Sequence, residues 1–333
     1  MGDQRLTSRL LKLASGFYAQ PVASIPQALG SKADRKGAYR FCHNKRVDMD
    51  SVLASHYAAT ETRITEQKIV LAVQDTTTLN YTAHPSPEGL GPINTEQDKA
   101  MGLIVHDTMA FSPEGTPLGL IDVQCWARDP EERGKRYERH EKQIEEKDSF
   151  KWLKSYRAVA EIQKRCRKTT LISLSDRESD IYELFLEAQQ TANGPKLVVR
   201  SERSRNRKVE EGNLWEKMAE EPVKGTLEVS VPRSHDRLPR EAKLEIRFSQ
   251  VELQPPMRKA ALPPICVRAV YALEVGCPAD EKPLELMLLT TVEVKSFEQA
   301  LQIVKWYIRR WGIEVYHRVL KSGCRIEDRQ LGT

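Results

Sequence analysis

Two short apolar runs, at residues 69–73 (IVLAV) and 170–174 (TLISL), constrain the fold most, because each is followed within two residues by an aspartate. A continuous apolar run of this length is typical of a strand that is buried on both faces, as in a sheet covered by helices. Sites in α/β proteins form beyond the carboxyl ends of such strands. The runs therefore predict an α/β domain in which Asp75 and Asp176 converge if their strands are neighbours.

The surrounding pattern gives an order of elements. Three helical stretches are expected first, beginning near residues 6, 31 and 49. A hairpin is predicted around the turn-forming insert SPEGTP, helices flank the second aspartate, and a mostly β segment precedes the last helix. The expected ranges are strands at 102–111 and 118–126, an exposed polar segment at 129–148, helices at 150–164 and 178–190, β structure over 196–291, and a helix over 296–322.

These elements divide the chain into four predicted parts. Residues 1–67 form a small basic helical region, and residues 68–195 form the first part of the α/β core. Residues 196–283 form a β-rich insertion, and residues 284–333 supply the last core strand and helix. The helical region is suited to bind DNA; the alternative is a helical cap on the main domain.

Composition excludes several classes of protein. No eighteen apolar residues occur together, so no membrane-spanning helix is expected, and the N-terminus lacks the apolar core of a secretory signal. Six scattered cysteines without a CxxC pair indicate reduced thiols and a cytoplasmic location. The net charge is only +5, but local basic clusters suit a polyanionic partner, the alternative being solvated loops. The clusters are Arg200, Arg203, Arg205, Arg207 and Lys208, and Arg233, Arg237, Arg240 and Lys243.

Asp75 and Asp176 together suggest a metal site. Two carboxylates that converge repel each other unless a cation lies between them. Hard oxygen ligands suit Mg²⁺ or Mn²⁺, and a pair of such ions stabilises both oxygens of a phosphodiester displacement. Each aspartate alone has a simpler explanation as a turn or N-cap residue, and Asp176 could cap the helix expected near residue 178.

The last helix carries an unusual polar face. Tyr307, Arg310, Glu314 and Lys321 are spaced three, four and seven residues apart, which places them on one side of a helix. Glu314 is the candidate for a third metal ligand, while Arg310 and Lys321 are suited to bind phosphates beside it. The alternative is a surface ion pair between Arg310 and Glu314.

Several motifs spread over nearly the whole chain resemble one family. They are GDQRLTSRL and KGAYRF near the N-terminus, QDTTTLNY around Asp75, SDRESDIY around Asp176, LVVRS at Arg200, and YIRRWGIEVYHRVLKSG at the end. The most specific is the Y-x2-R-x3-E-x6-K signature of the last helix. On these motifs the chain resembles the DDE transposases of insertion-sequence family four, the group that includes the transposon-five transposase.

The resemblance implies a fold and an activity. The fold is an RNase H-like catalytic core with a β-rich insertion before the last catalytic helix and a small N-terminal helical DNA-binding region. Asp75, Asp176 and Glu314 would form a catalytic triad that holds two Mg²⁺ ions, with Mn²⁺ able to substitute. The activity would be cut-and-paste transposition: strand cleavage at the transposon end, hairpin formation and opening, and joining to target DNA, all by two-metal phosphoryl transfer.

The resemblance also implies DNA contacts. Tyr307, Arg310 and Lys321 match residues that hold phosphates around a base flipped from the hairpin end, where a receiving pocket must offset the lost stacking. Arg200 matches another DNA-contacting position. Four residues match the region that reads the terminal repeats; the alternative is ordinary helix-surface charge. These four are Arg5, Arg9, Tyr39 and Arg40.

Three departures from the family pattern matter. Leu286 stands where the family's base-stacking tryptophan is expected. Trp306 and Trp311 are candidates to replace it, but both are explained equally well as core aromatics. The first part of the family's first DNA-binding helix is expected to be missing. The chain also ends at Thr333, before the family's C-terminal dimerisation region, so a homodimer is expected for the family but not for this truncated chain.

Three alternatives to a cytoplasmic, nucleoid-associated transposase stay open at this point. One is a non-catalytic protein that binds DNA ends or inhibits a full-length transposase. The second is an unrelated metal-dependent nuclease or phosphatase. The third is a glycosidase, which leaves the polar face of the last helix without a purpose.

Overall fold

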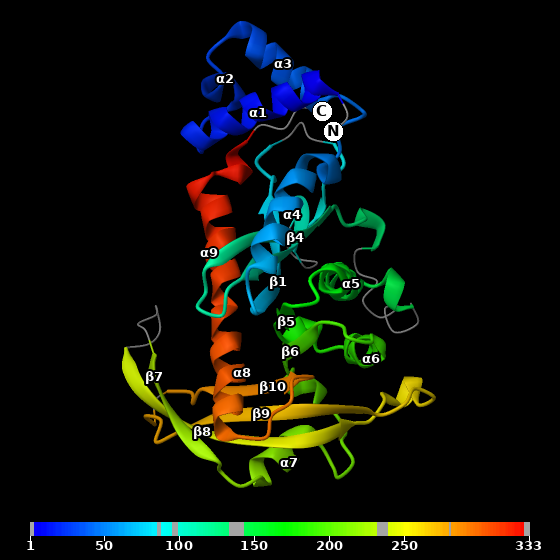
Figure 1. Ribbon diagram of the computed structural model, residues 1–333, viewed down its shortest axis with the longest axis vertical. Coiled ribbons are helices and arrows are strands. Elements are labelled where there is room, and N and C mark those ends of the chain that lie inside the picture. Colours follow the sequence, from blue (N-terminus) through cyan, green and yellow to red (C-terminus); the bar gives the residue numbers. More distant parts are fainter. Residues whose placement is uncertain are drawn as a thin grey trace.

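The computed structural model describes residues 3–84, 88–94, 99–132, 143–231, 239–279 and 281–329. The molecule is elongated (Figure 1). Small N-terminal helices lie at one end, a β-rich layer lies at the other end, and the central part contains a sheet with helices packed against it. The predicted α/β class is confirmed.

The N-terminal region contains four helices: α1 (Gln4–Ala19), α2 (Ile25–Ala28), α3 (Lys32–Cys42) and α4 (Met49–Thr65). Side-chain caps start three of them, since the carboxylate or hydroxyl oxygen of Asp3, Ser31 or Asp48 accepts a backbone N–H of the first turn. A small core forms where α1 meets α3. The three predicted helices are confirmed, whereas the four-residue α2 is too short for its periodicity to be read in the sequence.

One sheet of ten strands runs through the rest of the molecule, in the order β2-β3-β1-β5-β6-β10-β9-β8-β7, with β4 paired to β3. Strand β1 is parallel to β5, and β5 is parallel to β6; the other pairs are antiparallel. The strands are β1 (Ile69–Asn80), β2 (Gly91–Pro92), β3 (Met101–Phe111), β4 (Pro117–Trp126), β5 (Thr170–Ser175), β6 (Lys196–Arg200), β7 (Gly225–Val231), β8 (Arg240–Leu253), β9 (Ile265–Val275) and β10 (Glu285–Thr290).

The sheet differs from the sequence prediction in two respects. Strand β1 does not end before Asp75: its pairing with β3 continues to Asn80, whereas its pairing with β5 stops at Val73. The threonines at 76–78 favour this extension because β-branched residues suit a strand. Strand β6, expected at the start of a β-rich segment, lies in the middle of the sheet between β5 and β10.

Helices cover both faces of the sheet. Helices α5 (Phe150–Arg165), α6 (Tyr182–Gln190) and α7 (Leu214–Glu220) pack on one face. Helices α8 (Phe297–Arg309) and α9 (Trp311–Arg318) form the nearly straight rod that runs along the other face in Figure 1. Helix α6 starts later than predicted, because a 3₁₀ turn (Arg177–Ser179) comes first. Alternate residues of β1, β3 and β5 face α8 and α9, and this alternation orients the residues at the strand ends.

All six cysteines are free thiols. Among the described residues, no helix has both the length and the apolar character needed to cross a lipid bilayer.

The packing of α8 on the sheet predicts a stability difference between two isoleucines of this helix. Ile303 is 1% exposed within the core, whereas Ile308 is 51% exposed. Ile303→Ala should lower the free energy of unfolding by about 2–5 kcal/mol, because it leaves a cavity. Ile308→Ala, the matched control, should change it by less than about 0.5 kcal/mol, since it removes little packing. Urea denaturation measures both, and similar losses would contradict the position of α8.

Candidate active site

Asp75 and Asp176 occupy equivalent places on two neighbouring parallel strands. The register pairs Val73 with Leu174, and each aspartate follows two residues later. Asp75 therefore faces the same side as Val73, toward α9, which contacts β1. The two carboxylates are close enough that the charge of Asp176 raises the pKa of Asp75. The predicted convergence of these two side chains is what the structure shows.

The simpler explanation of Asp176 is also partly realised. Its carboxylate accepts a hydrogen bond from the backbone N–H of Glu178 at 2.9 Å, so it caps the 3₁₀ turn after β5. This bond occupies Oδ1 and leaves the other carboxylate oxygen available. Capping and a role in the site are therefore compatible.

Glu314, on α9, is connected to Asp75 by the side chain of Arg310. Nη2 of Arg310 donates to Oε1 of Glu314 at 2.5 Å, and Nη1 lies 3.5 Å from Oδ2 of Asp75. The side chain of Arg310 is only 15% exposed, so this is not the surface pair considered as an alternative. The guanidinium also lies 5.9 Å from the ring centroid of Tyr307, which is buried. One partly buried cation thus joins two of the three predicted carboxylates.

Burial dominates the electrostatics of both aspartates. Desolvation raises the pKa of Asp75 to about 6, against the lowering effects of Arg310, the Thr76 backbone N–H and His317. Desolvation likewise raises the pKa of Asp176, and the nearby Glu178 carboxylate raises it further, while Arg310 and Lys151 lower it. Arg310 therefore offsets only part of the cost of ionising the pair.

The donor set fits a hard divalent cation chemically. Asp75 and Asp176 are partly buried carboxylates whose negative charge is incompletely balanced, and such oxygens suit Mg²⁺ or Mn²⁺. Within the ranges that the structure describes, no three His, Cys, Asp or Glu side chains lie close enough to hold a metal in their present positions. The guanidinium of Arg310 lies between Asp75 and Glu314, so these two carboxylates can share a metal only if Arg310 moves.

The remaining predicted DNA contacts separate into groups. Burial raises the pKa of Tyr307, and the nearby cations Arg310 and Arg200 oppose this rise. Arg200, at the end of β6, therefore belongs to the same region as Arg310. Lys321 lies further along, in the π-helical turn Val319–Gly323, where Nζ is 3.8 Å from Oε1 of Glu327. The structure therefore brings Arg200 and Tyr307 to the carboxylates, and places Lys321 beyond them.

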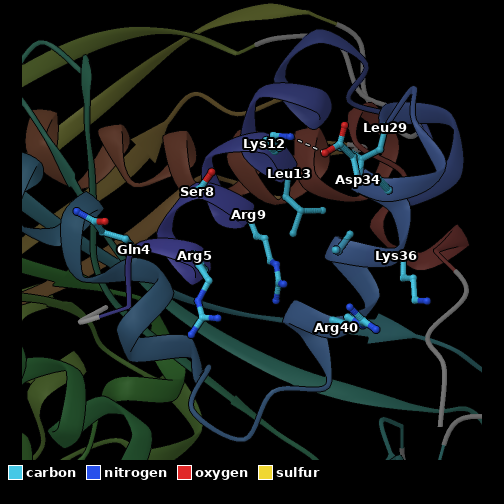
Figure 2. A pocket seen from close by; sticks show the side chains of 13 residues that line it. Gln4, Arg5, Ser8, Arg9, Lys12, Leu13, Leu29, Asp34, Lys36 and Arg40 are labelled. Carbon is cyan, nitrogen blue, oxygen red and sulfur yellow. Dashed lines mark hydrogen bonds and ion pairs between the residues drawn. The ribbon is translucent and has the colours of Figure 1, made fainter.

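The N-terminal candidates form a second region at the end of the molecule. Arg5 and Arg9 project from α1 into an open cavity of about 500 Å³, which Arg40 borders from α3 (Figure 2). Lys12 and Lys36 line the same cavity, and Lys12 is paired with Asp34. Tyr39 borders an adjoining cavity on α3 together with Arg40. Helices α1 to α3 lie at the end of the molecule, beyond α9 (Figure 1).

The structure also shows where the two predicted basic clusters, Leu286 and the two neighbouring tryptophans lie. In the first cluster, Arg207 is paired with the buried Asp180, and Arg203 is paired with Glu285. These two arginines therefore form ion pairs within the chain. Arg240 is likewise engaged by glutamates, and the two preceding arginines of its cluster lie outside the described residues. Leu286 packs against the α8 core; Trp306 is buried in that core, and Trp311 is 65% exposed.

Two residues near the carboxylates were not identified from the sequence. His317 on α9 lies 3.0 Å from Oδ2 of Asp107 through Nε2, and 4.0 Å from Oδ2 of Asp75 through Nδ1. Asp107 stands opposite Asp75 in the β1–β3 register and is 1% exposed. The available signals were a charged residue within the apolar run 103–111 and a histidine three residues after Glu314.

Comparison with known proteins adds two findings. Residues 1–47 match the family model described as Transposase DNA-binding. A solved cryo-EM structure of a piggyBac transposase synaptic complex with hairpin DNA is similar to this chain, with a TM-score of 0.42 and 9% sequence identity. The similarity covers 98% of this chain and 60% of that chain, so this chain spans about 60% of that protein's length.

The raised pKa of Asp75 predicts a pH-dependent cost of folding. Because the folded chain holds this proton up to about pH 6 and the unfolded chain only to about 3.8, ionised Asp75 destabilises the folded state above pH 6. The penalty disappears as the pH falls from 6 toward 4. Asp75→Asn should therefore be more stable than the wild type at pH 7 by up to about 3 kcal/mol, and equally stable near pH 4.

Urea denaturation without divalent metal measures this difference at each pH. Asp34→Asn is the matched control: hydrogen bonding by Lys12 lowers the pKa of Asp34, so this variant should gain no stability at pH 7. A gain for Asp34→Asn and none for Asp75→Asn would contradict the electrostatics of the site.

Proposed function

We propose that this chain is a DNA transposase of the cut-and-paste type whose carboxylates Asp75, Asp176 and Glu314 carry out phosphoryl transfer with two Mg²⁺ ions. The observation that carries the proposal is the approach of three acidic residues that are 101 and 138 positions apart in the sequence (176 − 75 and 314 − 176). Asp75 and Glu314 both contact the partly buried Arg310, and Asp176 is close enough to Asp75 for its charge to raise the pKa of Asp75. The match of residues 1–47 to a transposase DNA-binding model supports DNA as the partner.

The proposed fold assignment is an RNase H-like core. Its support is the sheet order β4-β3-β1-β5-β6, in which an antiparallel hairpin precedes two parallel strands and the two aspartates follow the shared register of β1 and β5. Strands β7 to β10 continue the same sheet beyond this core and precede α8.

Each group has a role in the proposed reaction. Asp75, Asp176 and Glu314 would hold the metal ions, which activate the attacking oxygen and stabilise the leaving one. Arg310, freed from the carboxylates, and Arg200 would bind DNA phosphates beside them. The buried Tyr307 supports Arg310 through its ring face. Lys321 would contact the DNA further along the same helix, and a homodimer would bring two DNA ends together.

One observation favours a second candidate, a protein that binds DNA ends without cleaving them. Arg310 is paired with both Asp75 and Glu314, and the N-terminal region presents a basic cavity lined by residues of α1 and α3. Such a protein would occupy transposon ends, or inhibit a full-length transposase, without metal chemistry.

Nicking of DNA distinguishes the two candidates. The substrate is a duplex that contains the inverted repeats flanking the gene of this chain, incubated with Mg²⁺. The wild type should nick it near the repeat end; Asp176→Ala and Glu314→Ala should lose cleavage and keep DNA binding, because these carboxylates act on the metal rather than on DNA. Binding without cleavage by the wild type would favour the second candidate. Loss of binding in both variants would assign the carboxylates a structural role.

Salt dependence tests the N-terminal surface. Arg40→Ala should weaken binding to the same duplex and reduce the slope of log affinity against log salt by about one, as expected when one phosphate contact is lost. Arg258→Ala is the control, because this exposed arginine lies in the 3₁₀ turn Met257–Lys259 after β8, remote from α1 and α3. Equal slopes for the wild type and Arg40→Ala would remove Arg40 from the DNA interface.

A further inference from the structure

His317 connects α9 to the sheet at the candidate site by a side-chain hydrogen bond to Asp107. Its side chain is 8% exposed, and its two ring nitrogens face two different aspartates. Nε2 is 3.0 Å from Asp107 on β3, and Nδ1 is 4.0 Å from Asp75 on β1. One ring therefore spans the adjacent strands that carry these carboxylates.

The ring orientation follows from the chemistry of its partners. The Asp107 carboxylate is an acceptor, so Nε2 carries the hydrogen and donates it. Asp107 is 1% exposed, and a carboxylate buried to this extent needs a hydrogen-bond donor. His317 supplies that donor from an element 210 residues away in the sequence. The bond is thus a tertiary link between α9 and the middle of β3.

The link sets how closely α9 approaches the sheet. Gly312 on the same helix faces Phe111 of β3 so closely that a Cβ at this position would lie 2.8 Å from the ring. Glu314 lies between Gly312 and His317 on α9, and Asp75 lies between β3 and β5 in the sheet. The separation of Asp75 and Glu314 therefore depends on contacts on both sides of Glu314: close packing before it and the hydrogen bond after it.

We propose that His317 and Asp107 form a positioning pair that fixes α9 against β1 and β3, and so keeps Glu314 across Arg310 from Asp75, where the two carboxylates would share a divalent cation once Arg310 has moved. The inference rests on the proposed function. In metal sites, groups that orient the ligands typically change metal affinity by about 10- to 100-fold when they are removed.

Mn²⁺ binding to the full chain tests the pair without any DNA. The measurement is the loss of the free Mn²⁺ signal in electron paramagnetic resonance. His317→Ala and Asp107→Ala should each raise the Mn²⁺ concentration for half-saturation by about 10-fold or more. The double variant should be no weaker than either single one, because both remove the same link. His317→Gln should recover most of the loss, since its amide can donate to Asp107. If His317→Ala fails to fold, His317→Phe keeps a ring without a donor and should show the same weakening.

His56→Ala is the matched control. His56 Nε2 accepts a hydrogen bond from the Leu120 backbone N–H at 2.9 Å, between α4 and β4 and away from α9. This variant should lose stability and keep wild-type Mn²⁺ affinity, so a purely structural role is separated from positioning.

The outcomes separate the two proposals. Mn²⁺ saturation that is lost in Asp176→Ala but unchanged in His317→Ala and Asp107→Ala would overturn the positioning pair and leave the proposed function standing. Additive losses in the double variant would also overturn the pair. A wild type that binds no Mn²⁺ would overturn the proposed function, and the pair with it.

Discussion

The partial burial of two neighbouring carboxylates, on β1 and directly after β5, is the constraint on which the site depends. Asp75 and Asp176 follow paired positions on β1 and β5, and removal from water raises the pKa of both. The folded chain accepts this cost because the surrounding sheet is held by a large apolar core on each face. A stable scaffold around a strained polar centre is the arrangement expected where function opposes stability.

Helix α9 and the segment that follows it connect the candidate site to the N-terminal helices. Beyond α9 and its π-helical turn, Arg329 donates to the backbone carbonyl oxygen of Ala23 at 2.9 Å, and its guanidinium lies 4.3 Å from the ring centroid of Phe17 on α1. Glu327 of the same segment accepts from the backbone N–H of Asn80 at the end of β1. The end of β1, the segment after α9 and the N-terminal helices are therefore tied together, so a macromolecule bound at α1 and α3 is placed in a defined relation to the carboxylates.

The sequence could predict the parts of the site that depend on local periodicity. The buried apolar runs predicted the two strands that bring Asp75 and Asp176 together, and helical spacing predicted that Glu314 lies on one face with Arg310. It could not predict the extension of β1 past Asp75, because that extension depends on pairing with β3, a contact between distant segments. The contact of His317 with Asp107 was missed for the same reason, since neither residue forms a local motif with the other. The position of the Arg310 guanidinium between Asp75 and Glu314 could not be predicted either, because helical spacing does not determine side-chain conformation.

The position of Arg310 connects metal binding with DNA binding in the proposed reaction. One guanidinium cannot neutralise Asp75 and Glu314 and at the same time make a bidentate contact with a phosphate. A phosphate that attracts Arg310 leaves the carboxylates without their cation, which increases their affinity for a divalent metal. By linkage, a metal bound there releases Arg310 and strengthens its contact with phosphate by the same free energy. In the proposed reaction, the Arg310 bridge would therefore make DNA and metal favour each other, and this coupling follows from charge balance alone.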